Sequence, residues 1–110
     1  MAPDVLAGYN VTMLFMVIEK YRLGPGPVYE RAAAQGRLLP EGLRYVDSWV
    51  VDDERLDRCF QLMETDNLEL FDLWRERWAD LADFEVFPVI KSDEAAHRVG
   101  VRWSAGGNGS

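Results

Sequence analysis

The stretch LRYVDSWVVDDERLDRCFQLMET, residues 43–65, decides the fold of this 110-residue chain. Two runs rich in strand-forming residues, 43–51 and 58–65, flank the acidic segment 52–55, which has low strand propensity. Because only a short segment separates the two runs, they are expected to pair as an antiparallel hairpin. The remaining elements are assigned relative to this hairpin.

Two further elements are expected before the hairpin. Residues 13–19 form a nearly continuous apolar run, which is typical of a central strand covered on both faces. The segment 24–27, Gly-Pro-Gly-Pro, then breaks the chain, and Pro27 suits the first turn of a helix that ends at Gly36. The first part of the chain therefore predicts a strand, a helix and then the hairpin.

A helix, a strand and a final short helix are expected after the hairpin. Asp66 and Glu69 resemble a capping box at the start of the first of these. Apolar residues then recur at helical spacing, namely Leu70, Trp74, Trp78 and Leu81. Residues 84–90 predict a fourth strand, in which Pro88 favours an edge position or a bulge. Ser92 is a candidate cap for the last helix.

The order strand, helix, strand, strand, helix, strand is the split βαβ pattern of a ferredoxin-like α+β sandwich. In that fold a four-stranded antiparallel sheet carries two helices on one face and leaves its other face open. A second copy packed sheet to sheet about a twofold axis is the simplest cover for such a face. The sequence thus predicts a homodimer formed through the open face of the sheet.

A single domain is expected over residues 13–103. Residues 1–12 lack clear periodicity and are interpreted as an N-terminal arm, and the Gly-rich residues 104–110 as a disordered tail. The chain is long enough for one hydrophobic core, which self-association would help to stabilise.

Charge and cysteine content exclude several classes of protein. The net charge of -7 argues against nucleic-acid binding, which requires clustered Lys and Arg. Cys59 is the only cysteine, so no intrachain disulfide can form, and nothing indicates an oxidising compartment. The apolar run 13–18 is too short to span a membrane, and no basic segment of a secretory signal precedes it. A cytoplasmic location is therefore expected.

Alternation along the three later strands places aromatic, acidic and amide side chains on one face, here called the mixed face, and mostly apolar side chains on the other. The residues assigned to the mixed face are Tyr45, Asp47, Trp49, Cys59, Gln61, Met63, Glu85, Phe87 and Val89. Those assigned to the apolar face, towards the helices, are Val46, Val50, Phe60, Leu62, Phe84, Val86 and Ile90. Because buried polar groups need partners, the mixed face is expected to be covered by a partner subunit, a ligand or both.

Several motifs resemble those of a bacterial family of small proteins that is classified as a domain of unknown function. They are MLFMVIE at 13–19, GRLLPEGLRYVDSW at 36–49, CFQLMETD at 59–66, Trp74-x-x-x-Trp78, Asp80-Leu81 and DFEVFPV at 83–89. The resemblance covers nearly all of residues 13–94. It implies membership of the dimeric α/β-barrel superfamily, whose members include cofactor-free monooxygenases, dehydratase-like and isomerase-like enzymes and stress-response dimers. The resemblance implies no particular reaction.

Asp47 is the candidate catalytic residue on the mixed face. A carboxylate flanked by Tyr45 and Trp49 would have a raised pKa if buried and would serve as a general acid or base. The alternative is a structural carboxylate that bonds to a backbone amide, an arginine or a twofold mate. Gln61 and Glu85 would either orient a small polar ligand or hydrogen-bond across the dimer seam.

Aromatic residues on the same face are candidates for a ligand site. Tyr45, Trp49 and Phe87 would line any cavity that a partner leaves there, which suits an aromatic or polyketide-like ligand. Trp74 and Trp78 are assigned instead to the core, because they fit the stripe of an amphipathic helix.

Neither a nucleophilic cysteine nor a metal or cofactor site is expected. Cys59 would need a base close by, and His97, the only histidine, lies in the late helix outside the core pattern. One histidine and one cysteine also argue against zinc and haem. Glu19, Asp47 and Glu85 would hold a hard cation only if they converged, which no spacing requires.

Two hypotheses of function remain. The first is a homodimeric cofactor-independent enzyme, similar to monooxygenases, cyclases or isomerases, with a small hydrophobic or aromatic substrate between sheet and partner. The second is a non-catalytic dimeric binding module. A cavity of about 300 Å³ or more would favour the first, because ligand sites have that size.

Overall fold

The computed structural model describes residues 12–102. Apart from Thr12, the predicted arm and tail lie outside the described residues. The elements, in chain order, are β1 (Met13–Tyr21), α2 (Pro25–Gln35), β2 (Arg44–Val50), β3 (Arg58–Thr65), α3 (Glu69–Glu76), β4 (Ala82–Val89) and α4 (Ser92–Arg98). This order confirms the predicted βαββαβ arrangement, with α4 as the final short helix.

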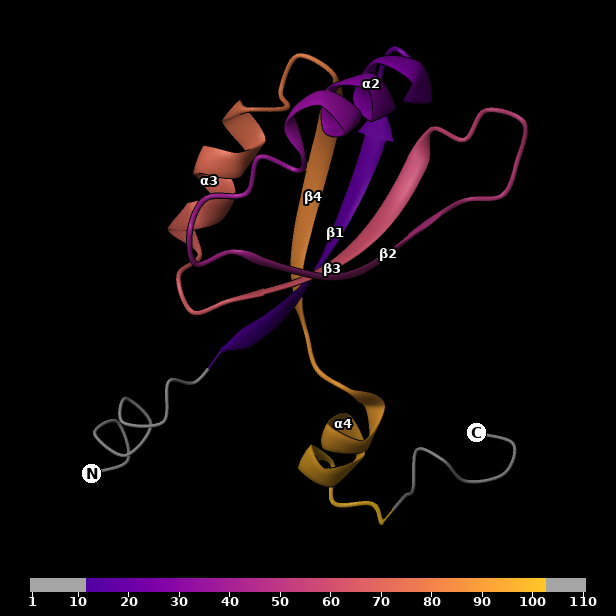
Figure 1. Cartoon of the computed structure of the whole chain (residues 1–110). Coiled ribbons are helices and arrows are strands. Elements are labelled where there is room, and N and C mark those ends of the chain that lie inside the picture. Colours follow the sequence, from indigo (N-terminus) through magenta and orange to yellow (C-terminus); the bar gives the residue numbers. More distant parts are fainter. Residues whose placement is uncertain (1–11, 103–110) are drawn as a thin grey trace.

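The four strands form one antiparallel sheet in the order β2-β3-β1-β4. The central position predicted for β1 is confirmed, since it pairs with both β3 and β4, and Pro88 lies in an edge strand as expected. Helices α2 and α3 cover one face of the sheet, while α4 extends away from it beyond the end of β4 (Figure 1). The architecture is a ferredoxin-like α+β fold.

Helix caps differ from the sequence prediction. Leu68 is the cap residue of α3, and Asn67 Oδ1 accepts a hydrogen bond from the Glu69 backbone N–H at 3.0 Å, so the predicted capping box is not formed. The cap of α4 is Lys91 rather than Ser92. The predicted stripe faces the core, but only Leu70 and Trp74 lie in α3. The helix ends at Glu76, and the buried Trp78 and Leu81 follow in the turn after it.

The hydrophobic core lies between the sheet and helices α2 and α3. Phe15, Val17 and Met63 are fully buried on the inner face of the sheet, and Phe71 reaches them from α3. The rings of Phe15 and Phe71 meet edge to face, with centroids 5.1 Å apart. Aromatic side chains therefore supply much of the contact between the two layers.

Strand β3 presents Cys59, Gln61 and Met63 to the helices, which is opposite to the predicted orientation. Gln61 pairs with Val17 of β1, and both side chains are buried. Because directly opposite residues share a face of the sheet, the inner face of β1 fixes that of β3. Phe60 and Leu62 therefore lie on the opposite face, here called the open face.

Strand β2 changes face at a bulge. The register shifts between Tyr45 and Asp47, so that Tyr45 pairs with Met63 on the helix side, while Asp47 pairs with Leu62 on the open face. An extra residue in one strand reverses its alternation beyond that point. The prediction that Tyr45, Asp47 and Trp49 share one face is wrong for this reason.

Strand β4 has the predicted orientation. Glu85 pairs with Ile18 and Phe87 with Met16 on the open face, while Phe84 and Val86 pack against the core. None of the helices within residues 12–102 is long and apolar enough to cross a membrane.

Candidate functional site

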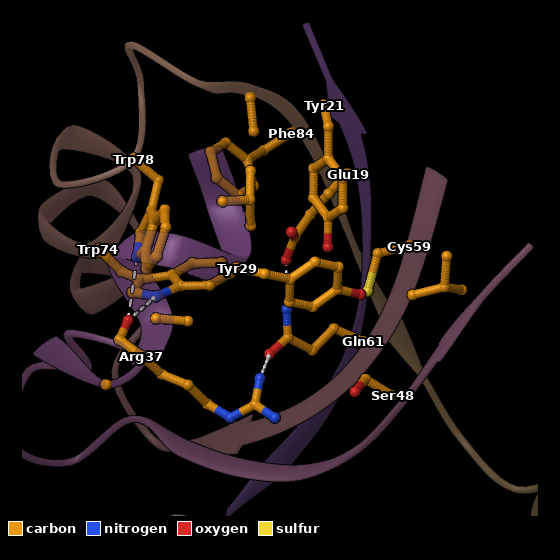
Figure 2. Close-up of a pocket in the computed structure, with 15 residues that line it drawn as sticks. Glu19, Tyr21, Tyr29, Arg37, Ser48, Cys59, Gln61, Trp74, Trp78 and Phe84 are labelled. Carbon is orange, nitrogen blue, oxygen red and sulfur yellow. Dashed lines mark hydrogen bonds between the residues drawn. The ribbon is translucent and has the colours of Figure 1, made fainter. Parts of the chain in front are cut away.

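A pocket of about 340 Å³ lies between the inner face of the sheet and the helices α2 and α3 (Figure 2). Its apolar walls include Val28, Tyr29, Trp74, Trp78 and Phe84. Its polar groups are Glu19, Tyr21, Arg37, Ser48, Cys59 and Gln61. The volume is within the range of ligand sites, and a mostly apolar wall with a few polar groups is typical of them. This helix-side pocket is on the face opposite to the predicted one.

Glu19 is the buried acid of the helix-side pocket. Strand alternation places Phe15, Val17, Glu19 and Tyr21 on the inner face of β1, where Glu19 is only 5% exposed. Burial raises its pKa from 4.5 to about 7, although the hydrogen bond from Gln61, the charge of Arg37 and hydrogen bonding with Tyr21 all lower it. Glu19 therefore exchanges its proton close to neutral pH.

Gln61 connects Glu19 to Arg37. Its Nε2 donates a hydrogen bond to Glu19 Oε2, and its Oε1 accepts one from Arg37 Nη1 at 2.9 Å. Because a guanidinium can only donate, the amide oxygen must face Arg37 and the amide nitrogen must face the carboxyl group. Oε2 of Glu19 is thereby an acceptor.

The backbone of Arg37 is anchored by two tryptophans. The indole Nε1 atoms of Trp74 and Trp78 donate hydrogen bonds to the Arg37 carbonyl oxygen, at 3.1 and 2.9 Å. The residues on either side, Gly36 and Leu38, have positive φ angles of 74° and 60°. This turn directs the Arg37 side chain under Gln61, as Figure 2 shows.

The guanidinium of Arg37 lies over the ring of Tyr45, 3.6 Å from its centroid. Tyr45 Oη in turn shares a 2.8 Å hydrogen bond with Ser48 Oγ. Arg37 as a residue is exposed, although it lines the pocket. The stacked guanidinium therefore lies where the helix-side pocket meets solvent.

Tyr21 and Cys59 are protonated partners beside Glu19. Burial raises the pKa of the Tyr21 hydroxyl above its ordinary value, and the charge of Glu19 raises it further. Burial also raises the pKa of the Cys59 thiol. Because the nucleophile is the thiolate, this environment supports the interpretation of Cys59 as an unreactive buried cysteine. Tyr21 remains a hydrogen-bond donor at neutral pH.

The six residues predicted from the sequence fall into two separate groups. Gln61 lines the helix-side pocket, and Tyr45 supports it by stacking under Arg37. Trp49, Glu85 and Phe87 lie with Asp47 on the open face, on the far side of the sheet. These six residues do not form one site.

Asp47 is an exposed residue rather than the buried carboxylate that the sequence suggested. Its Oδ1 accepts a hydrogen bond from the Ser48 backbone N–H at 2.8 Å, which is one of the structural roles considered for it. The buried carboxyl group of the helix-side pocket belongs to Glu19 instead. Glu19 and Glu85 lie on opposite faces of the sheet, and in the described part of the chain no three His, Cys, Asp or Glu residues are grouped to hold a metal ion.

Sequence reasoning missed Tyr21 and Arg37 as site residues, and it considered Glu19 only as a ligand of a hard cation. One signal for Glu19 was available, because it is the single acid within an otherwise apolar run. Trp74 and Trp78, which were assigned to the core, are buried as expected and also hold the pocket loop through their indole nitrogens.

The comparison with curated proteins finds no match to this chain, and neither does the comparison with solved structures. The model of one protein family, described as Domain of unknown function (DUF3303), matches residues 13–101. That match spans most of the chain, including every strand of the sheet and every residue of the helix-side pocket. The chain therefore belongs to the DUF3303 family of proteins.

Proposed function

We propose that this protein is a cofactor-independent enzyme that transfers protons on a small aromatic or polyketide-like metabolite bound in the helix-side pocket. The observation that carries the proposal is the buried Glu19 carboxyl, which lines the pocket and has a pKa of about 7. A general acid or base works best when its pKa is close to the working pH. Perturbed carboxyl groups in pockets are also frequent functional residues.

The polar neighbours of Glu19 suit enolisation of a carbonyl compound. Glu19 would take a proton from the carbon next to the carbonyl group. The Tyr21 hydroxyl would exchange its hydrogen bond with Glu19 for one to the substrate oxygen that gains negative charge. Return of the proton to another carbon completes an isomerisation. Attack of the enolate carbon on a second carbonyl group closes a ring, and the alkoxide that forms takes the proton back from Glu19. Both reactions need a proton-transfer group and a hydrogen-bond donor, which Glu19 and Tyr21 supply, so isomerisation or cyclisation is the proposed class of reaction.

The pocket walls support an aromatic substrate. Trp74 and Phe84 have ring centroids 5.1 Å apart, and Tyr29 and Trp78 complete the apolar lining. Flat rings of a ligand pack well against such walls, and removal of water from them favours binding. A volume of about 340 Å³ accommodates one or two fused rings.

We also propose that a second copy of the chain covers the open face. Its apolar side chains are Leu14, Met16, Ile18, Trp49, Phe60, Leu62, Phe87 and Val89. Trp49 is 52% and Phe87 45% exposed. The charged residues of this face lie at its margins, with Asp47 and Glu85 in the edge strands β2 and β4 and the Arg44–Glu64 ion pair towards one end. An apolar centre with charged residues around it is the usual composition of a homodimer interface, and a twofold axis would place this face on itself.

Hydrogen exchange into a bound ligand tests the proposed reaction. Aromatic β-dicarbonyl compounds would be screened for binding by thermal shift, and each hit would be followed by NMR in deuterated water. The expected result is faster deuterium incorporation next to the carbonyl group with the wild-type protein than with Glu19→Gln. The control variant Asp47→Asn, altered on the open face, should exchange the ligand as fast as the wild type.

A non-catalytic binding module is the second candidate. It is favoured by the hydrogen bond between Gln61 and Glu19, which satisfies the buried carboxyl group without any ligand. Ligands that bind in the pocket without faster deuterium exchange would support this alternative and contradict the enzyme.

A further inference from the structure

We infer that the ligand of the helix-side pocket is an aromatic carboxylate, whose anionic group binds the guanidinium of Arg37 and whose ring lies along Trp74 and Phe84. This inference rests on one part of the proposed function, namely that the pocket binds a small molecule. It specifies the chemical class of that molecule and the residue that selects it.

Arg37 has hydrogen-bonding capacity that its neighbours do not use. Within residues 12–102 its side chain donates one hydrogen bond, to Gln61 Oε1, and forms no ion pair with a carboxylate. The arginines that do pair with carboxylates are Arg22, Arg31, Arg44, Arg55 and Arg98. A guanidinium carries five N–H donors in a planar fork that matches a carboxylate.

The position of Arg37 is fixed before any ligand binds. Stacking on Tyr45 holds the plane of the guanidinium, and the hydrogen bonds from Trp74 and Trp78 hold its backbone. Little side-chain freedom remains to be lost on binding, which increases affinity. The arrangement favours a bidentate contact with a carboxylate over a contact with a spherical anion.

Ionised Glu19 would repel an anion bound in the pocket, and protonation of Glu19 removes this repulsion. The titratable groups that face it are Tyr21 of β1, Tyr29 of α2, Cys59 of β3 and Arg37. Burial raises the pKa of Tyr21 and Cys59, which keeps both neutral at pH 7. A carboxylate on Arg37 also weakens the attraction between Arg37 and ionised Glu19. Anion binding is therefore coupled to proton uptake by Glu19, and the complexes in which Glu19 stays ionised, whose share rises with pH, are those in which it can act as a base.

Isothermal titration of the full chain with 2-naphthoate and its uncharged analogue 2-naphthamide tests this inference. At pH 6 the carboxylate is expected to bind at least about tenfold more tightly, because hydrogen bonds between charged groups are stronger than neutral ones. Its affinity should fall between pH 6 and pH 8 as Glu19 ionises. The Glu19→Gln variant should lose that pH dependence and keep the preference for the carboxylate.

Arg37→Gln is expected to remove the preference for naphthoate, and Arg37→Lys to retain part of it. The backbone anchor survives in both variants, and an unchanged near-UV circular dichroism spectrum will show that they fold. Arg44→Gln is the matched control, because Arg44 pairs with Glu64 on the open face, and it should bind naphthoate like the wild type.

Equal binding of amide and carboxylate to the wild type would overturn the inference and leave the pocket intact. Binding of neither probe would count against both the inference and the proposed function.

Discussion

Gln61 donates a hydrogen bond to Glu19 across the boundary between β3 and β1, on the inner face of the sheet. The two residues are diagonal neighbours, since Glu19 pairs with Cys59 and Gln61 with Val17. Both are at least 95% buried, so their hydrogen bond is shielded from bulk water. The pair is thus a fixed part of the sheet, and each property of the carboxyl group depends on the amide beside it.

Substitution of Gln61 by leucine is expected to raise the pKa of Glu19 above 7. The hydrogen bond from Nε2 stabilises the ionised carboxylate, so its removal favours the protonated form. Carboxyl carbon chemical shifts of Glu19, followed by NMR against pH, measure the change. A pKa that stays the same or falls would mean that Gln61 does not stabilise the charge.

Stability is expected to fall as the pH rises from about 4.5 to 7. Below this range Glu19 is protonated in both states, and within it the unfolded chain loses the proton while the folded chain keeps it. Folded molecules therefore bind more protons, and the free energy of unfolding decreases by about 3 kcal/mol, at about 1.4 kcal/mol per pKa unit.

Urea unfolding of the wild type and of Glu19→Gln, measured between pH 4.5 and 8, tests this dependence. The variant should lack the decrease and be the more stable protein at pH 8. Asp57 and Asp80 have lowered pKa values because Lys20 and Arg31 hydrogen-bond to them, so they titrate below this range. If the free energy of unfolding falls equally with pH in the two proteins, Glu19 is not the titrating group.

Replacement of Trp74 or Trp78 by phenylalanine is expected to cost roughly 2 kcal/mol or more each, because it removes one hydrogen bond, worth about 1 kcal/mol, and leaves a cavity where the larger indole was buried. Each single variant keeps one indole on the Arg37 carbonyl oxygen. The double variant loses both and should be destabilised by more than the sum, because the carbonyl group then has neither partner. Urea unfolding of the three variants gives the coupling free energy. An additive result would mean that the two hydrogen bonds do not share this anchor.

Local sequence signals were sufficient for the fold. Residues 13–19 and 58–65 are apolar runs of strand length, and the breaks between elements carry Gly, Pro or clustered acids. These features act over a few neighbours, so the order of elements and the central position of β1 could be predicted. The capping box at Asp66 failed because Asn67, one residue later, offers an equivalent oxygen to the start of α3.

The faces of the strands could not be predicted, and the site depended on them. Alternation divides β3 into two faces, but only its pairing with Val17 and Phe15 shows which face the helices cover. The bulge between Tyr45 and Asp47 is likewise set by pairing with β3. Arg37 was missed because its place depends on a carbonyl oxygen held by tryptophans about forty residues away in the chain.

Gly42→Ala is expected to destabilise the protein by about 1 to 3 kcal/mol. Gly42 has a φ angle of 99°, which side-chain-bearing residues rarely adopt, and an added Cβ would lie 2.9 Å from Leu70 Cδ1. Thermal unfolding measures the loss. Gly26→Ala in α2 is the matched control, because its Cβ would meet no atom within 4 Å, and it should be neutral or stabilising.

Leu62→Lys is expected to convert the proposed dimer into a monomer. Leu62 lies on the open face between Met16 and Asp47, so a twofold partner would bury the lysine ammonium in an apolar contact. The neighbouring Asp47 would be buried together with the lysine, and removing both charged groups from water costs more than their attraction returns. Sedimentation velocity, together with light scattering, gives the mass of each protein.

The matched control is Ala33→Lys, which adds the same charge to an exposed position of α2 and should leave the mass unchanged. A dimer that persists in Leu62→Lys would place the interface elsewhere, and a wild-type monomer would show that the open face is not paired with a second copy.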